Sequence, residues 1–211
     1  MKSRAGEEST GSWTAATRRQ LERRLPWENL LPDRQPFYVG SWVYVFGVVT
    51  IAALVWVVLS GVVLAAFGPQ WWHLSSVGRF FNSLHFWSVQ VFFVFMVLHL
   101  WGQFFMASWR EGRAPTWMIG VLTFAISIVA AFTGYLSQQN FDAQFIAVNA
   151  KDAMNAAGAG AFFNVLNFGQ MYGLHVMLLP IGITILVVAH IVMVRTRGVV
   201  KPIDPEGTER P

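Results

Sequence analysis

The sequence of 211 residues contains no cysteine. Without cysteine the chain cannot form disulfides, thiolate metal sites, iron–sulfur clusters of its own or covalent c-type haem. Charge is also scarce, because Asp, Glu, Lys and Arg make up only 12% of the residues, about half the share in soluble domains. Together with 55% hydrophobic residues, this composition excludes a disordered chain, a coiled coil and an ordinary soluble enzyme.

Four long apolar segments are present instead, at about residues 37–67, 80–107, 117–136 and 172–194. Each is long enough to cross about 30 Å of hydrocarbon as a helix. The segments do not alternate polar with apolar residues, and an open sheet edge is unstable in lipid, so helices are predicted. The predicted fold is therefore an all-α membrane protein, a four-helix transmembrane bundle.

The predicted organisation has three parts. Residues 1–36 form a polar extension, in which arginines between positions 18 and 24, with Trp13 and Leu21, are typical of a basic amphipathic helix on a membrane surface. A solvated positive tail is the alternative interpretation of this extension. Residues 37–202 form the transmembrane domain, and residues 203–211 form a short tail. The long connection at 137–171 is expected either to fold into short surface helices or to have a functional role.

Lysine and arginine are distributed unevenly over the predicted connections. With four spans, both chain ends and the connection between the second and third spans lie on one side of the membrane. All but two of the 15 Lys and Arg residues fall in these three stretches, and the exceptions are Arg79 and Lys151. The positive-inside rule predicts a multi-pass protein of the cell membrane with both termini in the cytoplasm. This distribution also explains the net charge of +4 without a nucleic-acid partner.

Four of the five histidines lie inside the second and fourth predicted spans. His85 and His99 are fourteen residues apart, and each therefore lies near one face of the second helix. His175 and His190, fifteen residues apart, do the same on the fourth helix. These two spans run in the same direction. His85 is therefore expected to face His175 near the outer surface. His99 is expected to face His190 nearer the cytoplasm.

An imidazole on each side of the iron is the typical axial ligation of a b-type haem. The histidine pattern therefore predicts two stacked, non-covalent haems, each held by two histidines. The two haems would carry electrons from one membrane surface to the other. A glycine allows a bulky group to approach the backbone closely. The first and third spans hold two glycines each, again fourteen residues apart, which are interpreted as walls opposite the haem edges: Gly47, Gly61, Gly120 and Gly134.

A histidine-relay transporter or proton channel is an alternative from another functional class, because intramembrane histidines also serve proton transfer. Such a relay needs further acidic groups inside the membrane. The apolar cores of the four predicted spans contain no Asp or Glu, which favours the haem interpretation. The remaining histidine, His73, lies in the first connection and is interpreted as an interfacial polar residue.

These residues resemble the N-terminal, four-helix half of cytochrome b, and most closely the short cytochrome b6 form, over residues 37–202. The four histidines and four glycines occur in the family's order, with the unequal histidine spacing of the b6 type. Local strings that look like b6 begin at His85, Thr116, Leu174 and His190. The third of these strings extends to Pro180, which is expected to bend the fourth helix and so adjust for its longer histidine spacing.

The resemblance implies a subunit of a quinol oxidoreductase of the bc or b6f type. In that family, quinol is oxidised at the outer face, and one electron passes to a Rieske iron–sulfur protein and then to a cytochrome c. The other electron passes through the two haems to a quinone near the cytoplasm. The resemblance further implies a dimeric complex surrounded by membrane lipid. A separate subunit, similar to subunit IV, would supply the later cytochrome b helices.

The sequence departs from the family at several positions. The usual Pro-Trp step after Gly134 and Tyr135 is absent, and Val45 replaces the cysteine that tethers an extra haem in b6. The arginines that flank the first histidine in b6 are replaced by Asn82 and Phe86. Arg79 is a candidate for a haem propionate contact. Candidates for the outer quinone region are Arg79, Tyr135 and the connection at 137–171, and candidates for the inner quinone are Arg113 and the arginines at 18–24. The missing Pro-Trp step keeps an alternative open, a two-haem anchor that connects another dehydrogenase to the quinone pool.

Overall fold

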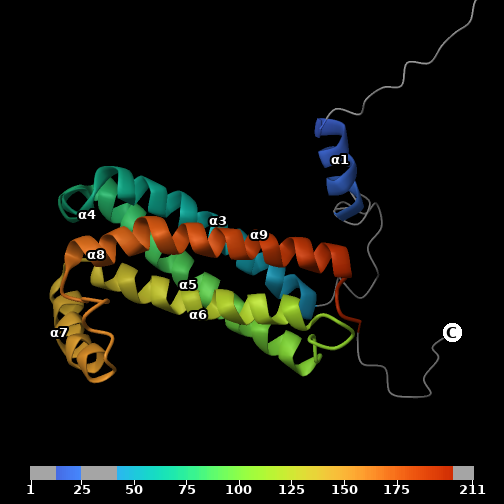
Figure 1. Ribbon diagram of the computed structural model, residues 1–211. Helices are drawn as coiled ribbons and strands as arrows, with labels where there is room; N and C mark the ends of the chain where they lie inside the picture. Colours follow the sequence, from blue (N-terminus) through green and yellow to red (C-terminus); the bar gives the residue numbers. More distant parts are fainter. Residues whose placement is uncertain (1–12, 25–41, 202–211) are drawn as a thin grey trace, which may run out of the picture.

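Four long helices lie side by side and form an elongated bundle (Figure 1). They are α3 (Trp42–Phe67), α5 (Ser76–Phe105), α6 (Ala114–Leu136) and α9 (Leu179–Arg197). The computed structural model describes residues 13–24 and 42–201, and within these ranges there is no strand. Four helical segments are long and apolar enough to cross a membrane, the last of them being Phe168–Arg197. The prediction of an all-α protein with four spans is confirmed.

The short helices lie mainly at one end of the bundle. This end, called here the loop end, carries α4 (Pro69–Leu74), α7 (Phe141–Ala156) and α8 (Phe168–Gly173) (Figure 1). The opposite end, called the tail end, carries the connection between α5 and α6 and the segment after α9. Helix α1 (Trp13–Arg24) is drawn beside the tail end. The predicted features at residues 1–12, 25–41 and 202–211 lie outside the described residues.

Helix boundaries follow from local capping. The Ser75 side chain accepts a hydrogen bond from the Gly78 backbone N–H at 3.3 Å, which satisfies one free donor at the start of α5. The Asn140 side chain caps α7 in the same way through the Ala143 N–H at 2.8 Å. Helix α6 has a proline in its first turn, where the missing N–H costs no helical hydrogen bond. These caps place the polar connections at the two ends of the bundle.

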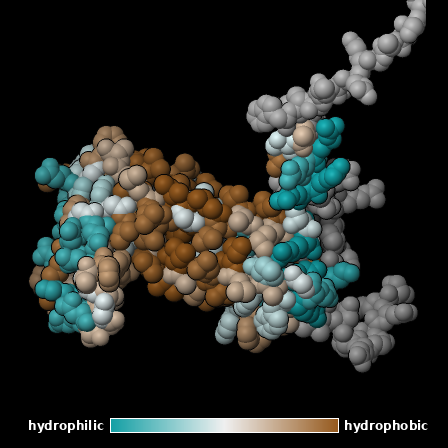
Figure 2. Space-filling model, viewed as in Figure 1, coloured by the Kyte–Doolittle hydropathy of each residue, from teal (hydrophilic) through white to brown (hydrophobic). Residues whose placement is uncertain are grey.

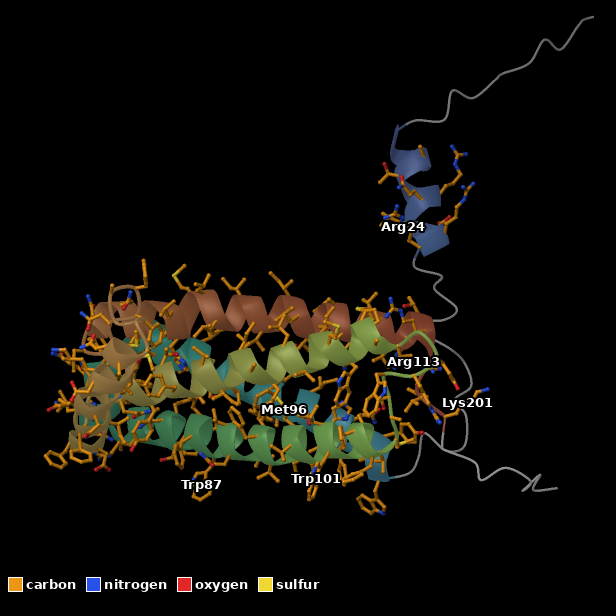
Figure 3. The ribbon with its side chains drawn as sticks, turned by 60° about the horizontal axis from the view of Figure 1, so that its bottom comes forward. Arg24, Trp87, Met96, Trp101, Arg113 and Lys201 are labelled. Carbon is orange, nitrogen blue, oxygen red and sulfur yellow. The ribbon has the colours of Figure 1, made fainter. Side chains whose placement is uncertain are left out.

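The bundle consists of two closely packed helix pairs. Helix α3 packs mainly on α5, and α6 packs mainly on α9. Halfway along the bundle, a cluster of buried side chains from α3 and α5 fills the interior, namely Ala53, Phe92 and Met96, with Phe124 of α6 packed against it. Figure 3 shows Met96 between the helices, whereas Trp87 and Trp101 of α5 project outward.

The outer surface of the bundle is apolar between two polar ends (Figure 2). Large hydrophobic side chains are exposed along the long helices, including Trp56 at 56%, Val62 at 63% and Ile185 at 63%. In water this surface would be unstable, but in a bilayer it is the surface that lipid and partner helices contact. The chain is therefore an integral membrane protein.

Candidate cofactor sites

Two cavities lie one after the other along the bundle axis, separated by the buried cluster around Phe92. The loop-end cavity has a volume of about 410 Å³ and is lined by His85 and His175. The tail-end cavity has a volume of about 420 Å³ and is lined by His99 and His190. Residues from all four spans line each cavity, so both cavities lie between the two helix pairs. Their volumes are within the range of small-molecule and cofactor sites, about 300–1,000 Å³.

The imidazole rings of His85 and His175 face each other across the loop-end cavity. Their centroids are 6.1 Å apart and their planes are nearly perpendicular, at 88°. Two imidazoles on opposite sides of one metal atom, each nitrogen about 2 Å from it as in zinc sites, have centroids roughly 6 Å apart. The separation of His85 and His175 therefore fits an iron atom between them.

Three of the four histidines are held by backbone carbonyls on the neighbouring helix. His85 Nδ1–H donates to the Val57 carbonyl at 3.0 Å. His175 Nδ1–H donates to the Ala130 carbonyl at 2.9 Å, and His190 Nδ1–H donates to the Thr116 carbonyl at 3.1 Å. A carbonyl only accepts, so Nδ1 carries the hydrogen in each case. This arrangement leaves Nε2 free to bind a metal, and it fixes the direction of each ring.

Additional hydroxyl contacts support two of these rings. Ser60, which is 1% exposed, donates to the Trp56 carbonyl at 2.6 Å and accepts from His85 Nδ1 at 3.1 Å. The Thr116 side chain accepts from Arg197 at 3.1 Å, next to the carbonyl that receives His190. The Nδ1 atom of His99 is buried and has no partner among the described residues.

Each of the four glycines lies against one histidine ring. A Cβ atom added at Gly47 would be 3.0 Å from Cε1 of His99. A Cβ added at Gly61 would be 3.1 Å from Cε1 of His85, and one added at Gly120 would be 3.2 Å from Cε1 of His190. At Gly134 a Cβ would be 2.8 Å from both ring nitrogens of His175. The glycines were interpreted above as walls opposite haem edges, but in the structure the close neighbour is an imidazole.

The accepting carbonyls and the glycines follow a common register. Val57 precedes Gly61 by four residues, Thr116 precedes Gly120 by four, and Ala130 precedes Gly134 by four. Residues four apart lie one above the other on the same helix face. One helical turn therefore supplies both the acceptor for a histidine and the space for its ring. A side chain larger than hydrogen at the glycine would separate the imidazole from its acceptor.

A π-helix lies within the fourth span, directly before α9. It covers Leu174–Leu178 and includes His175. A π-turn holds about one residue more than an α-turn, because its hydrogen bonds join residues five apart. The extra residue between His175 and His190 is therefore absorbed here, and both rings stay on the face that lines the cavities. Pro180 follows directly, and its missing N–H removes the α-helical bond to the carbonyl of Val176.

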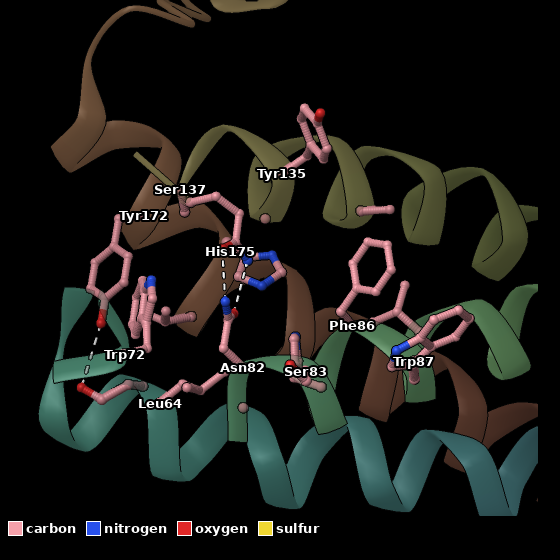
Figure 4. A pocket seen from close by; sticks show the side chains of 18 of the residues that line it. Leu64, Trp72, Asn82, Ser83, Phe86, Trp87, Tyr135, Ser137, Tyr172 and His175 are labelled. Carbon is pink, nitrogen blue, oxygen red and sulfur yellow. Dashed lines mark hydrogen bonds between the residues drawn. The ribbon is translucent and has the colours of Figure 1, made fainter. Parts of the chain in front are cut away.

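The end of the loop-end cavity beyond the histidines is polar but uncharged (Figure 4). Asn82 and Gln138 form a reciprocal pair of amide hydrogen bonds at 3.2 Å and 3.1 Å. His73 Nε2 donates to the Gln138 backbone carbonyl at 2.9 Å. Trp72 also lines the cavity and is 5% exposed, and its Nε1 has no hydrogen-bond partner among the described residues.

Two candidates for this region lie differently from the histidines. Arg79 is exposed, is not among the described residues that line the cavity, and donates to the His73 carbonyl at 3.5 Å. Tyr135 is one of the lining residues but is 40% exposed, and Figure 4 shows its side chain directed away from His175. The structure brings the four histidines and four glycines together, but it does not bring Arg79 into the cavity.

The tail-end cavity has a cationic mouth. Arg113 and Arg195 are among its lining residues, together with the segment after α9. Arg113 forms an ion pair with the exposed Glu111 at 2.6 Å, and this hydrogen bond lowers the pKa of the Glu111 carboxyl. Tyr44 donates to the Val200 carbonyl at 2.7 Å and holds this segment over the cavity. The arginines predicted at positions 18–24 are not among the described residues that line it.

The donor set fits haem better than a bare metal ion. Among residues 13–24 and 42–201, no group of three or more His, Cys, Asp or Glu could hold a metal. Paired histidines match haem iron, because the porphyrin supplies the remaining ligands and the protein adds only the axial ones. Mainly apolar walls, two histidines and a polar mouth in each cavity therefore agree with the chemistry of that cofactor.

Sequence reasoning missed several residues that shape these sites. The carbonyls of Val57 and Ala130 act through the main chain, so no side chain signals them. Ser60 directly precedes Gly61, and Trp72 lies in a short helix outside the four spans. Only the position of Ser60 beside a glycine gave a signal that could have been used.

A family model matches residues 90–210, more than half of the chain, and its description reads Cytochrome b(N-terminal)/b6/petB. The chain belongs to this family. Membership confirms the resemblance deduced from the histidines and glycines. Membership in the cytochrome b family implies haem binding, and the matched residues include His99, His175 and His190.

Similar curated proteins are also described as cytochrome b or cytochrome b6. A cytochrome b subunit of a cytochrome bc complex from Chlorobaculum thiosulfatiphilum is 30% identical over 136 residues, which are 60% of this chain and 32% of that protein. A cytochrome b subunit of a menaquinol:cytochrome c reductase from Geobacillus thermodenitrificans is 25% identical over 206 residues, 84% of this chain and 92% of that protein. A cytochrome b6 from Heliobacterium mobile is 26% identical over 209 residues, 86% and 98% respectively.

A solved structure, described as a hyperthermophilic respiratory Complex III, has the same fold. Its TM-score is 0.66 at 19% sequence identity, covering 93% of this chain and 57% of that chain. The chain thus spans just over half of this structural neighbour and about a third of the Chlorobaculum cytochrome b. The cytochrome b from Geobacillus has nearly the same extent as the present chain.

Proposed function

We propose that this chain is the two-haem cytochrome b subunit of a bc-type quinol oxidoreductase in the cell membrane. His85 and His175 would be the axial ligands of one haem, and His99 and His190 those of the other. Gly47, Gly61, Gly120 and Gly134 would give the four imidazoles their space. The observation that carries the proposal is the pair of histidine-lined cavities, in which the rings of His85 and His175 oppose each other and three of the four Nδ1–H groups bind carbonyls.

Bound haem would supply reversible one-electron chemistry at two depths in the membrane. The residues of this chain would position both groups, exclude water and set the polarity around them. The buried apolar cluster around Phe92 and Met96 would help to exclude water from the space between the two histidine pairs. Neutral histidine ligands and hydrogen bonds to backbone carbonyls suit an interior without buried acids. The chain would thus serve as an electron path across the bilayer rather than as a complete enzyme.

The partners are proposed from the resemblance to the b6 form of the family. In that form a separate subunit, similar to subunit IV, would supply the later cytochrome b helices. Quinol would be oxidised at the loop end, which we assign to the outer face, and a quinone reduced near the cytoplasmic tail end. One quinol electron would pass to a Rieske protein and then to a cytochrome c, and the other would pass through the two haems. The complex would be a dimer in the lipid bilayer, with both termini of this chain in the cytoplasm.

A second candidate function is a two-haem anchor that links another dehydrogenase to the quinone pool. It is favoured by the sequence after Tyr135, where Leu136 and Ser137 end α6 and the Pro-Trp step of the family is absent. Mass spectrometry of the purified complex separates the two candidates. A Rieske protein among the co-purified subunits supports the first, and a large dehydrogenase without a Rieske protein supports the second.

Haem quantification with a reduced-minus-oxidised spectrum tests the central proposal. The intact complex is expected to contain two b-type haems per chain. His190→Ala is expected to retain one of them, because only the tail-end cavity loses a ligand. Lys151→Ala is the control, since Lys151 is exposed on α7 and outside both cavity linings. A wild-type complex without haem, or a His190→Ala variant with both haems, would contradict the proposal.

A further inference from the structure

The polar mouths of the two cavities differ in charge. Arg113 and Arg195 line the tail-end cavity. Among the described residues that line the loop-end cavity there is no Lys or Arg, and the polar groups beyond the histidines are amides, hydroxyls and an indole. Arg79, the nearest cationic candidate in the sequence, is exposed and bonded to the His73 carbonyl instead. A carboxylate placed in the loop-end cavity would therefore meet neutral donors.

Three N–H donors at this end remain available. Asn82 and Gln138 each use one amide hydrogen in their reciprocal pair, at 3.2 Å and 3.1 Å, and each amide has a second hydrogen. The third donor is the indole N–H of Trp72, which is buried and has no partner among residues 13–24 and 42–201. A buried N–H without an acceptor is costly, so an unpaired indole within a cavity lining indicates an acceptor on the bound molecule.

These donors lie at the correct depth for the edge of a group held by His85 and His175. Asn82 precedes His85 by three residues, and Gln138 follows Gly134 by four. Asn82 is therefore about one helical turn, or roughly 5 Å, beyond His85 along the bundle axis, and Gln138, just after the end of α6, is held beside it by their two hydrogen bonds. The hydrogen bond from His73 to the Gln138 carbonyl holds the end of α6 in place. In Figure 4 the Trp72 side chain stands between Tyr172 and Asn82.

From these observations we infer that Trp72, with the Asn82–Gln138 pair, binds a propionate carboxylate of the haem in the loop-end cavity through neutral hydrogen bonds. The inference rests on the proposed haem site and names the residues that hold the cofactor's acidic edge. Neutral donors compensate a carboxylate charge less than arginine does. The remaining negative charge of the propionate favours the ferric state of the haem iron. The hydrogen bond from Trp72 would reduce this preference, because it partly neutralises the carboxylate.

The experiment uses the full haem-loaded complex after extraction of quinone. Trp72→Phe keeps the ring but removes the N–H, and Asn82→Leu removes the amide pair at similar volume. Resonance Raman spectroscopy of the propionate bending band and a spectroelectrochemical titration are measured for both haems. Each variant is expected to shift the band of one haem only and to lower its reduction potential. The second haem is expected to stay at its wild-type values.

Two controls separate this inference from its rivals. Trp71→Phe alters the same short helix outside the cavity lining, where Trp71 stacks on Phe67 at 4.5 Å, and it is expected to leave both haems unchanged. Arg79→Gln is expected to do the same. A shift in Arg79→Gln but not in Trp72→Phe would place the carboxylate on Arg79 and overturn the inference. A Trp72→Phe effect that arises only after quinone is added back would assign the indole to quinone and also overturn it.

The failure of this inference differs from the failure of the proposed function. If both haems are present and both variants match the wild type in Raman band and potential, the inference is wrong and the haem sites stand. If the wild-type complex contains no haem, the proposed function itself is wrong. If Trp72→Phe is not assembled, the Asn82→Leu measurement decides alone.

Discussion

Among the four glycines that lie against a histidine ring, Gly134 leaves the least space for a side chain. A Cβ there would be 2.8 Å from Nδ1 and Nε2 of His175, and the ring is held by the Ala130 carbonyl at 2.9 Å. Ala130 and Gly134 lie on the same helix, so α6 cannot move away from the His175 ring without lengthening the hydrogen bond to the Ala130 carbonyl. The absence of a side chain at Gly134 is therefore what allows His175 both to reach its acceptor and to face His85.

Gly134→Ala is accordingly expected to displace the His175 ring and to weaken retention of the loop-end haem by roughly ten-fold or more. Haem content of the purified variant, measured by difference spectroscopy, checks this. Gly182→Ala is the matched control in the same bundle, because a Cβ at Gly182 meets nothing within 4 Å. The control is expected to change stability by no more than about 1 kcal/mol. Equal haem content in both variants would show that Gly134 has no role in holding the ligand.

At the scale of the helix, the fourth span contains a local change of helix type between its two histidines, which affects the direction in which each ring points. Fifteen residues at about 100° each go about 60° beyond four turns, whereas fourteen end about 40° short. The π-helix at Leu174–Leu178 takes up one residue, so the His175–His190 interval acts like the fourteen-residue interval of α5. The sequence predicts a bend at Pro180. The structure has a widened turn just before this proline. Pro180 fits there because it has no backbone N–H to donate to the Val176 carbonyl.

Deletion of Met177 in a Pro180→Ala background is expected to convert the widened turn into a regular α-helix and to keep both haems. Met177 is 63% exposed, so its removal costs little packing inside the bundle. The matched change is deletion of Val91, 43% exposed, between His85 and His99 in the regular helix α5. That deletion rotates one ligand by about 100° and is expected to lose a haem. The number of haems per chain is measured for both deletions, with Pro180→Ala alone as the reference. If the Met177 deletion also loses a haem, the π-helix does not compensate for the extra residue.

At the scale of the whole molecule, charge separates the two ends of the bundle. Five basic residues lie at the tail end: Arg110 and Arg113 between α5 and α6, Arg195 and Arg197 in the last turn of α9, and Lys201 after it. Figure 3 labels Arg113 and Lys201 at this end. At the loop end the basic residues among those described are Arg79 and Lys151. This distribution is the physical basis for assigning the tail end to the cytoplasm.

The absence of cysteine makes this orientation directly testable. In intact cells, Lys151→Cys is expected to react with a membrane-impermeant maleimide, because Lys151 is exposed on α7 at the loop end. Lys201→Cys, at the tail end, is expected to react only after the membrane is permeabilised. The unaltered chain, which contains no thiol, gives the background. Labelling of position 201 in intact cells would reverse the assigned orientation.

The sequence by itself determined the four spans, the two histidine pairs and the family. Apolar runs of this length form helices in lipid because every backbone group must be satisfied within the segment. The histidines were recognisable because intervals of fourteen and fifteen residues return nearly to the same face, and a polar ring inside a span needs a reason. These features are local in the chain or periodic along one helix.

Only the tertiary structure decided what each histidine and glycine contacts. That Gly134 faces the His175 ring depends on how α6 packs beside the fourth span, and the Val57 carbonyl has no side-chain signature at all. The Asn82–Gln138 pair joins residues 56 positions apart, and Trp72 reaches the same cavity from a short helix outside the spans. Contacts between distant segments arise from the packing of whole helices, which periodicity within one segment does not specify.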